Sequence, residues 1–194
     1  MTSVQVQPTA IREVLMIQPR QFNDKRGWFM ESFNLSGFED IFRQQGQVLP
    51  QFVQDNHSLS HQGVLRGLHY QRHPHAQGKL IRVVQGKSYH VAVDLRQRSK
   101  TFAQWVTVEL DAISSNMLWV PAGFAHGFVA LEHTTQLLYK TTAYYAPASE
   151  RTLQWNDPDL AIRWPLDVAG QPIISSKDEQ GVSLKQAIQQ QELF

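Results

Sequence analysis

The feature that most constrains the fold is a dense run of short strand-like stretches in the middle of the chain. Each stretch is rich in apolar residues and is followed by turn-forming residues. The stretches cover residues 65–71, 79–84, 88–95, 103–110, 117–120, 127–131 and 136–142. Short strands at this spacing are typical of antiparallel sandwiches and barrels. We therefore predict an all-β fold with few helices.

Weaker strand signals precede this region. Residues 14–17 are expected to form a first strand. Residues 28–33 alternate so that Phe29, Glu31 and Phe33 would share one face of a second strand. A carboxylate between two aromatic residues indicates a face that lines a pocket or is covered by another chain.

One short helix is expected early in the chain. Apolar residues at helical spacing predict it over residues 37–45, and Ser36 with Glu39 matches a capping box at its start. No linker-like composition divides the sequence, so residues 1–194 are expected to form one domain.

A further strand and a C-terminal arm complete the prediction. Residues 52–58 resume strand character and place Gln54 and Asn56 on one face. Amides on an inward face bind a ligand or, more commonly, the backbone. Residues 146–194 are expected to form an irregular arm that ends in a short helix over residues 183–193.

The composition argues against several classes of protein. A formal net charge of +1 gives no basic surface for nucleic acid or a membrane. No segment approaches the roughly 18 apolar residues of a membrane span, and no signal-peptide core is recognisable. The absence of cysteine excludes disulfides and thiolate zinc sites. We expect a soluble, cytoplasmic protein.

Three ionisable residues, Arg66, His69 and Lys79, lie within strand-like stretches that are otherwise apolar. Burying an unpaired charge is costly, so these side chains must be paired, face a cavity or point into water at a barrel edge. The residues alone leave both the cavity and the edge open. Regular alternation would put Arg66 and His69 on opposite faces, and only a bulge, for which Gly67 is the natural place, would bring them to one site.

The same side chains suggest acid–base chemistry. His69 is a candidate general base, because imidazole titrates near neutrality. Lys79 offers a positive charge to an oxyanion, Tyr139 a proton donor inside the barrel, and Arg66 a bidentate contact to phosphate. Each residue taken singly also fits a structural role. Together they indicate acid–base chemistry on an anionic carbonyl compound.

A metal site would use some of the same histidines. His69, His73, His75 and His126 could supply imidazole ligands to a β-barrel metal centre. However, His73 and His75 flank a proline in a turn-rich insert, and no glutamate follows at the spacing of cupin metal sites. We therefore expect neither a metal nor another cofactor.

Eight motifs in order resemble the dTDP-4-dehydrorhamnose 3,5-epimerase family. The resemblance covers about residues 14–178. The motifs are FNDKRGWFMESFN (22–34), FVQDNHS (52–58), RGLHYQ (66–71), QGKLIRV (77–83), VAVDLR (91–96), PAGFAHGFVAL (121–131), LYKTTAYYAPASE (138–150) and SSKD (175–178).

The resemblance implies a cupin-like β jelly-roll with short peripheral helices that forms a homodimer and needs no metal. It implies epimerisation of dTDP-4-dehydro-6-deoxy-D-glucose at C3 and C5 to dTDP-4-dehydro-L-rhamnose, a step in dTDP-L-rhamnose and O-antigen biosynthesis. Both carbons flank the C4 ketone, so loss of either proton gives an enolate.

The family pattern also implies roles for individual residues. His69 would abstract the proton, Asp178 would orient its imidazole, Lys79 would stabilise the enolate oxygen, and Tyr139 would return a proton from the opposite face. The residues that match substrate-binding positions are Arg26, Phe29, Glu31, Gln54, Asn56, Arg66, His126, Glu150 and Lys177. Because dimers of this family exchange N-terminal strands, residues 26–31 would serve the neighbouring subunit.

The sequence departs from the family pattern at two places. Tyr89-His90 stands where a Phe-Asp pair is usual, and residues 132–136 are atypical of the following turn. These departures keep open a single-centre epimerase of a related deoxysugar. Two rival functions within the same fold are a non-catalytic sugar-binding cupin and a metal-dependent cupin dioxygenase.

Overall fold

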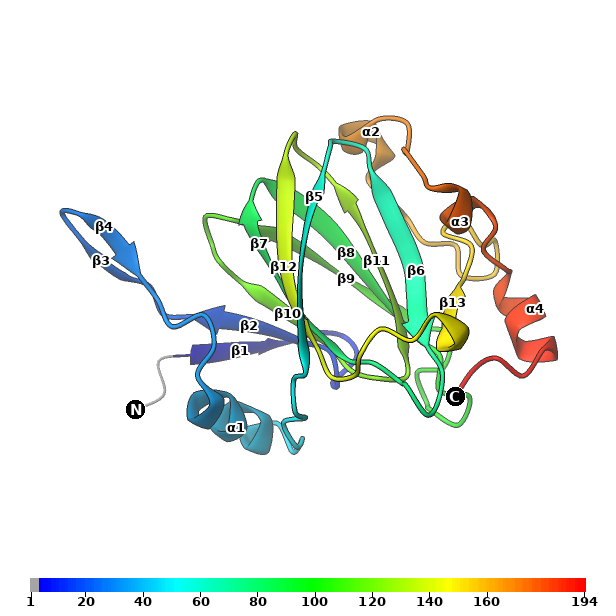
Figure 1. Cartoon of the computed structure of the whole chain (residues 1–194), viewed down its shortest axis with the longest axis horizontal. Coiled ribbons are helices and arrows are strands. Elements are labelled where there is room, and N and C mark those ends of the chain that lie inside the picture. Colours follow the sequence, from blue (N-terminus) through cyan, green and yellow to red (C-terminus); the bar gives the residue numbers. More distant parts are fainter. Residues whose placement is uncertain (1–3) are drawn as a thin grey trace.

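The computed structural model describes residues 4–194, so the first three residues of the expected domain lie outside the described residues. Most elements are strands, as predicted. They form two large antiparallel sheets and one separate two-stranded hairpin (Figure 1). The six-stranded sheet runs, in spatial order, through β1 (Val4–Pro8), β2 (Leu15–Pro19), β10 (Met117–Val120), β7 (Lys79–Gln85), β12 (Thr135–Thr141) and β5 (Gln54–Ser60). The five-stranded sheet contains β13 (Glu150–Thr152), β6 (Leu65–Gln71), β11 (Phe124–Ala130), β8 (Lys87–Asp94) and β9 (Trp105–Asp111).

The main core lies between the two sheets. Ile81 and Val83 of β7 and Leu137 of β12 belong to the same buried cluster as Phe128 of β11, which lies in the opposite sheet. Because side chains alternate along a strand, Lys79 shares the inner face of β7 with Ile81 and Val83. The alternation that builds the core thus also directs a charged side chain inward.

The N-terminal strand predictions need correction. The strand predicted over residues 14–17 is β2, which lies slightly later and pairs with β1, a strand that was not predicted. The strand predicted over residues 28–33 ends at Phe29, because β4 (Gly27–Phe29) pairs with β3 (Phe22–Asp24) in a separate hairpin. Phe29 is exposed, whereas Phe33 packs against Phe52, so the alternation around Glu31 does not describe one sheet face.

The first helix, α1 (Leu35–Gln44), begins two residues earlier than predicted and has a different cap. Asn34 is the N-cap, and its side chain accepts a hydrogen bond of 3.2 Å from the Gly37 N–H. The predicted capping residue, Ser36, lies inside the helix. Serine and asparagine both suit an N-cap, so composition alone could not choose between these two positions.

The C-terminal arm is more ordered than expected. It contains β13 and four short helical segments: η1 (Pro147–Ser149), α2 (Leu166–Ala169), α3 (Ser176–Glu179) and α4 (Leu184–Gln189). The helix predicted over residues 183–193 exists as the shorter α4. Leu184 of α4 packs with Leu68 and Val91, which lie on the outer face of the five-stranded sheet, and Figure 1 shows the arm along this face.

A bulge in β6 confirms the prediction made for Gly67. The register between β11 and β6 shifts there, so that His126 lies opposite His69 and Phe128 lies opposite Arg66. Gly67 has a φ of +118°, a conformation that residues with a Cβ rarely adopt. The shift brings Arg66 and His69 to the same cavity.

The first prediction concerns the stability of this bulge. A Cβ on Gly67 would lie 2.6 Å from the Gly127 Cα and 2.7 Å from the His126 carbonyl oxygen, and backbone atoms cannot rotate away. Gly170 also has a positive φ, +82°, but nothing lies within 4 Å of its added Cβ. We expect Gly67→Ala to reduce the free energy of unfolding by about 1–3 kcal/mol more than Gly170→Ala, as overpacking does. Urea unfolding measures both variants, and equal losses would contradict this account.

Candidate active site

A cavity of about 130 Å³ lies between the two sheets. Strands β5, β7 and β12 form one wall, and β6 and β11 form the other. Its lining residues are Ser58, Arg66, His69, Lys79, Ile81, His126, Phe128, Leu137 and Tyr139. The structure thus brings the predicted base His69, cation Lys79 and acid Tyr139 together in one cavity. Arg66 and His126, which were predicted to bind substrate, line the same cavity. The interpretation as a barrel edge with solvated charges does not hold for His69 and Lys79, whereas Arg66 lines the cavity and also remains exposed.

His69 is held by the C-terminal arm. Its Nε2 forms a hydrogen bond with Oδ1 of Asp178, which is buried on α3. Burial alone would raise the pKa of Asp178, but hydrogen bonds from His69, Ser175 and the Gly67 backbone leave that pKa below its usual range. The carboxylate therefore stays ionised and accepts the Nε2 proton, so the lone pair of neutral His69 lies on Nδ1. This is the arrangement of an oriented general base.

Lys79 enters the cavity from β7. Burial lowers the pKa of Lys79 to about 8, and the negative charge of Glu150 opposes this change. At neutral pH the ammonium group is therefore still mostly protonated. A positive charge shielded from water interacts strongly with an oxyanion, so Lys79 is suited to stabilise an enolate.

Tyr139 lies on the wall opposite His69. It belongs to β12 of the six-stranded sheet, whereas His69 belongs to β6 of the five-stranded sheet. Burial raises the pKa of Tyr139, and the charge of Arg66 partly offsets this increase. The phenol therefore keeps its proton at neutral pH. A proton acceptor and a proton donor on opposite walls can act on opposite faces of a bound molecule.

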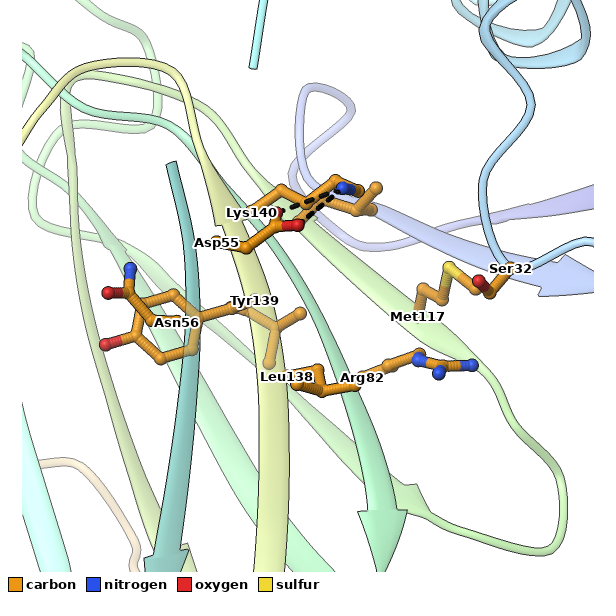
Figure 2. Close-up of a pocket in the computed structure, with 10 residues that line it drawn as sticks. Ser32, Asp55, Asn56, Arg82, Met117, Leu138, Tyr139 and Lys140 are labelled. Atoms are coloured by element: carbon orange, nitrogen blue, oxygen red, sulfur yellow. Dashed lines mark hydrogen bonds and ion pairs between the residues drawn. The ribbon is translucent and has the colours of Figure 1, made fainter. Parts of the chain in front are cut away.

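Two predicted amides lie beside this acid. Figure 2 shows the Asn56 amide next to the Tyr139 ring, on the other side of β12 and β5 from Leu138. Gln54 Nε2 donates a 2.9 Å hydrogen bond to Asn56 Oδ1, and Gln54 Oε1 accepts one of 3.1 Å from the Tyr145 N–H. Gln54 and Asn56 thus share a face, as the period of two predicts.

A second pocket, of about 160 Å³, extends over the outer face of the same strands (Figure 2). The ammonium of Lys140 lies 3.0 Å from the carboxylate of Asp55, so these two charges neutralise each other. Arg82 and Met117 also line this pocket. Tyr139 lines both pockets, but the outer one contains no histidine and its lysine is paired with Asp55, so the inner cavity is the candidate active site.

Glu150 and Lys177 pair with each other. Lys177 Nζ lies 2.5 Å from Glu150 Oε2, which also accepts a 2.8 Å hydrogen bond from the Tyr145 hydroxyl. Burial acts to raise the pKa of Glu150, but these contacts keep it below its usual range. The Glu150 carboxylate also raises the pKa of Lys79, which links this pair electrostatically to the cavity.

The structure does not bring the N-terminal candidates to the cavity of their own chain. Arg26 is at the tip of the β3–β4 hairpin, where it contacts Asp24 at 2.5 Å. Phe29 is 65% exposed. Glu31 accepts a 3.2 Å hydrogen bond from Asn34. The hairpin projects away from both sheets (Figure 1), so the side chains on it cannot contact the His69 of the same chain.

His126 is backed by a buried polar pair that sequence analysis did not predict. His126 Nε2 lies 3.0 Å from His90 Nδ1, and His90 Nε2 lies 2.8 Å from the Ser88 hydroxyl. The His90 and His126 rings stack with centroids 5.3 Å apart. Burial lowers the pKa of His90 to about 3, and burial and the nearby cations lower that of His126 well below its usual range. Both imidazoles are neutral at physiological pH.

Some of these residues had recognisable signals. Ser58 lies two and four residues beyond Asn56 and Gln54, so the period of two could have added it to the cavity. Ser88 and His90 alternate along β8, but both could equally have faced solvent. Only the packing of β8 beside β11 places His90 against His126.

Within residues 4–194, no three histidine, aspartate or glutamate side chains are grouped so that they could hold a metal ion. His73 and His75 are exposed in the β6–β7 connection, whereas His69 and His126 line the cavity. The four histidines considered as ligands are thus divided between two places. In the same described part of the chain, no helix has the length and apolarity to cross a membrane.

The fold and cavity define a cupin-like β protein with an acid–base constellation between its sheets. Its sequence matches the family model described as dTDP-4-dehydrorhamnose 3,5-epimerase over residues 8–186. The chain belongs to this family.

Individual relatives agree with this assignment. The dTDP-4-dehydrorhamnose 3,5-epimerase of Pseudomonas aeruginosa is 51% identical over 92% of this chain and 94% of its own. The dTDP-4-dehydrorhamnose 3-epimerase of Streptomyces niveus is 34% identical over 95% of this chain and 86% of its own. The crystal structure of a dTDP-6-deoxy-D-glucose-3,5-epimerase from Legionella pneumophila, in complex with dTDP-4-keto-L-rhamnose, is similar with a TM-score of 0.90. It is 42% identical and covers 98% of this chain and 97% of that one.

The second prediction follows from the burial of Lys79. We expect its ammonium group to titrate with a midpoint of about 8, far below the ordinary lysine value of about 10.4. NMR of ¹³C-labelled lysine measures this titration, with Lys79→Arg assigning the resonance. Glu150→Gln should lower the midpoint further, because the Glu150 carboxylate favours the charged form. A midpoint near the ordinary lysine value would show that Lys79 is solvated.

Proposed function

We propose that this protein epimerises dTDP-4-dehydro-6-deoxy-D-glucose at C3 and C5, giving dTDP-4-dehydro-L-rhamnose. The observation that carries the proposal is the placement of His69 and Tyr139 on opposite walls of one cavity, with Lys79 between the sheets. The 3,5-epimerase of Pseudomonas is also more similar to this chain than the 3-epimerase of Streptomyces is, at 51% against 34% identity. That difference favours the double over the single epimerase.

The first half of the reaction is proton removal. Nδ1 of His69 takes the proton from the carbon next to the C4 ketone, and the C–H electron pair moves into an enolate. Asp178 stabilises the resulting imidazolium through its hydrogen bond to Nε2. The Lys79 ammonium interacts more strongly with the enolate oxygen than with the ketone, which lowers the barrier.

The second half is proton return from the other face. The Tyr139 hydroxyl protonates the enolate carbon, which inverts the centre and regenerates the ketone. The resulting phenolate lies near the positive charge of Arg66, which favours the ionised phenol. Removal of a proton from one wall and its replacement from the other is the minimum that inversion requires.

The remaining candidates are assigned to substrate binding. Arg66 and Lys177 offer charges to the diphosphate, and Gln54 and Asn56 offer amides beside the sugar site. His126 and Glu150 lie in or beside the cavity and would contact the sugar. Because the substrate is a nucleotide sugar made from nucleoside triphosphates, we place the activity in the cytoplasm.

We also propose that the protein is a homodimer, with the whole chain as one domain. Phe22, Trp28 and Phe29 on the hairpin are 44%, 56% and 65% exposed. In a dimer, a second copy would cover these aromatic residues. Arg26, Phe29 and Glu31 of one copy would then lie at the cavity of the other copy. Exposed apolar side chains at the end of a projecting hairpin support this arrangement.

The third prediction assigns the base and the acid. In deuterated water with the dTDP-4-keto sugar, NMR should show deuterium at C3 and C5, and a rhamnose-forming reductase should consume the product. His69→Ala should abolish exchange at both carbons while nucleotide binding survives. Tyr139→Phe should retain exchange but lose most epimerised product, because proton removal no longer leads to inversion.

Matched controls use side chains outside the cavity. His133 is exposed, and the Tyr89 hydroxyl only approaches the Arg163 carbonyl at 3.4 Å. Exchange in His133→Ala and Tyr89→Phe should match the unmodified protein. Full exchange in His69→Ala would refute the assignment of the base. Exchange at C3 alone would establish the single-centre epimerase, and absence of exchange would favour a sugar-binding protein.

The fourth prediction tests the shared site. Arg26→Ala and His69→Ala should each be defective as homodimers. A heterodimer of the two, purified through two different tags, should regain about half of the normal activity, because one of its two sites contains both intact residues. If the hairpin served its own chain, every site would carry one defect and no activity would return.

A further inference from the structure

One buried polar chain ends at His126 and includes two residues to which the proposed mechanism gives no role. It consists of Ser88 and His90 on β8 and His126 on β11. Ser88 and His90 are fully buried, and neither lines the cavity, whereas His126 does. A chain of hydrogen bonds that ends at a cavity side chain can fix the proton position on that side chain.

The Ser88 hydroxyl determines which groups donate and which accept along this chain of hydrogen bonds. In the described part of the protein, the hydroxyl has one hydrogen-bonding partner, His90 Nε2 at 2.8 Å. A buried hydroxyl that only accepted this bond would leave its own proton without an acceptor, which is costly. The hydroxyl therefore donates, and His90 Nε2 carries a lone pair.

The proton positions on His90 and His126 follow by elimination. Neutral His90 has one ring proton, which must then lie on Nδ1 and be donated to His126 Nε2 at 3.0 Å. His126 Nε2 is the acceptor, so the single proton of neutral His126 lies on Nδ1. This is the ring nitrogen that remains available to a molecule in the cavity.

We propose that Ser88 and His90 are positioning residues that hold His126 as a neutral imidazole protonated on Nδ1, so that it donates a hydrogen bond into the cavity and does not act as a second base. The tautomer follows from the hydrogen-bond geometry of Ser88, His90 and His126 and from the neutrality of the two buried imidazoles. The identity of the acceptor, the enolate oxygen, rests on the proposed function.

Electrostatics supports a neutral donor at this position. The ionisable groups that face His126 from the surrounding strands are Arg66 and His69 on β6, Lys79 on β7, His90 on β8 and Tyr139 on β12. Two of these groups, Arg66 and Lys79, are cations. Burial is the largest cause of the low pKa of His126, and His90, Lys79 and His69 lower this pKa further. A neutral hydrogen-bond donor adds no further positive charge to this cavity.

His90 stands where an aspartate is usual in the family pattern, and this difference changes the direction of the hydrogen bond to His126. An aspartate can only accept when it is ionised, so it would draw the proton of His126 to Nε2 and favour the imidazolium. Histidine at this position reverses the direction of the hydrogen bond. The two residues thus specify opposite proton arrangements on the same cavity imidazole.

The first test is the tautomer itself. Long-range ¹H–¹⁵N NMR of the ¹⁵N-histidine-labelled dimeric protein, without substrate, reports which nitrogen of each histidine carries a proton. His126→Gln assigns the signals. We expect His126 to be protonated on Nδ1 and unprotonated on Nε2. A proton on Nε2 would overturn the proposal even if the protein proved to be the expected epimerase.

The second test uses two isosteric variants. In His90→Asn the side-chain amide can still donate to His126 Nε2, whereas in His90→Asp the carboxylate can only accept. We expect the pH profile of kcat in His90→Asn to follow that of the unmodified protein. In His90→Asp the carboxylate should raise the pKa of His126. At pH values above this pKa, neutral His126 would keep its single proton on Nε2 and could not donate from Nδ1. We expect kcat to fall there by about 10²-fold, as when one oxyanion donor is lost. A KM that changes less than kcat would place the effect on the reaction step.

The comparison separates positioning from packing. Asparagine and aspartate have nearly the same volume, so a purely structural role would give the two variants the same pH profile, and that result would overturn the proposal. If neither variant nor the unmodified protein acts on the sugar, the proposed function fails. The NMR result on the substrate-free protein would still decide the tautomer.

Discussion

The cavity geometry depends on one backbone constraint, the bulge at Gly67 in β6. Without this change in register, Arg66 and His69 would lie on opposite faces of the strand. The backbone of the same glycine also helps to keep the pKa of Asp178 low, and Asp178 holds His69. Gly67 thus determines that Arg66 and His69 point to the same cavity, and it also contributes to the surroundings of Asp178.

Local sequence patterns predict the parts of the structure that local forces determine. The strands between residues 65 and 142, the inner face of β5 and the need for a bulge at Gly67 all follow from periodicity and from the cost of burying charge. The residue types suggest His69 as a base and Tyr139 as a proton donor, and the resemblance to a known family implies their specific roles. The structure then places both of them in one cavity.

The errors concern features that tertiary packing decides. The alternation around Glu31 resembles a strand, but the chain leaves the hairpin at Phe29 and turns toward α1. The C-terminal arm gains its order from contacts with the outer face of the five-stranded sheet, which no local pattern shows. The Ser88–His90–His126 chain depends on the pairing of β8 with β11 and has no counterpart in the spacing of these residues.

The arm also links local stability to chemistry. His69 belongs to a central sheet, but its carboxylate partner lies on α3, 109 residues later, in a segment of short helices. Segments of this kind open by local unfolding at a lower free energy than the sheets to which they attach. The population of protein with an oriented base therefore depends on the contacts that hold the arm in place as well as on the two sheets. The enzyme can lose function on warming while its two sheets remain intact.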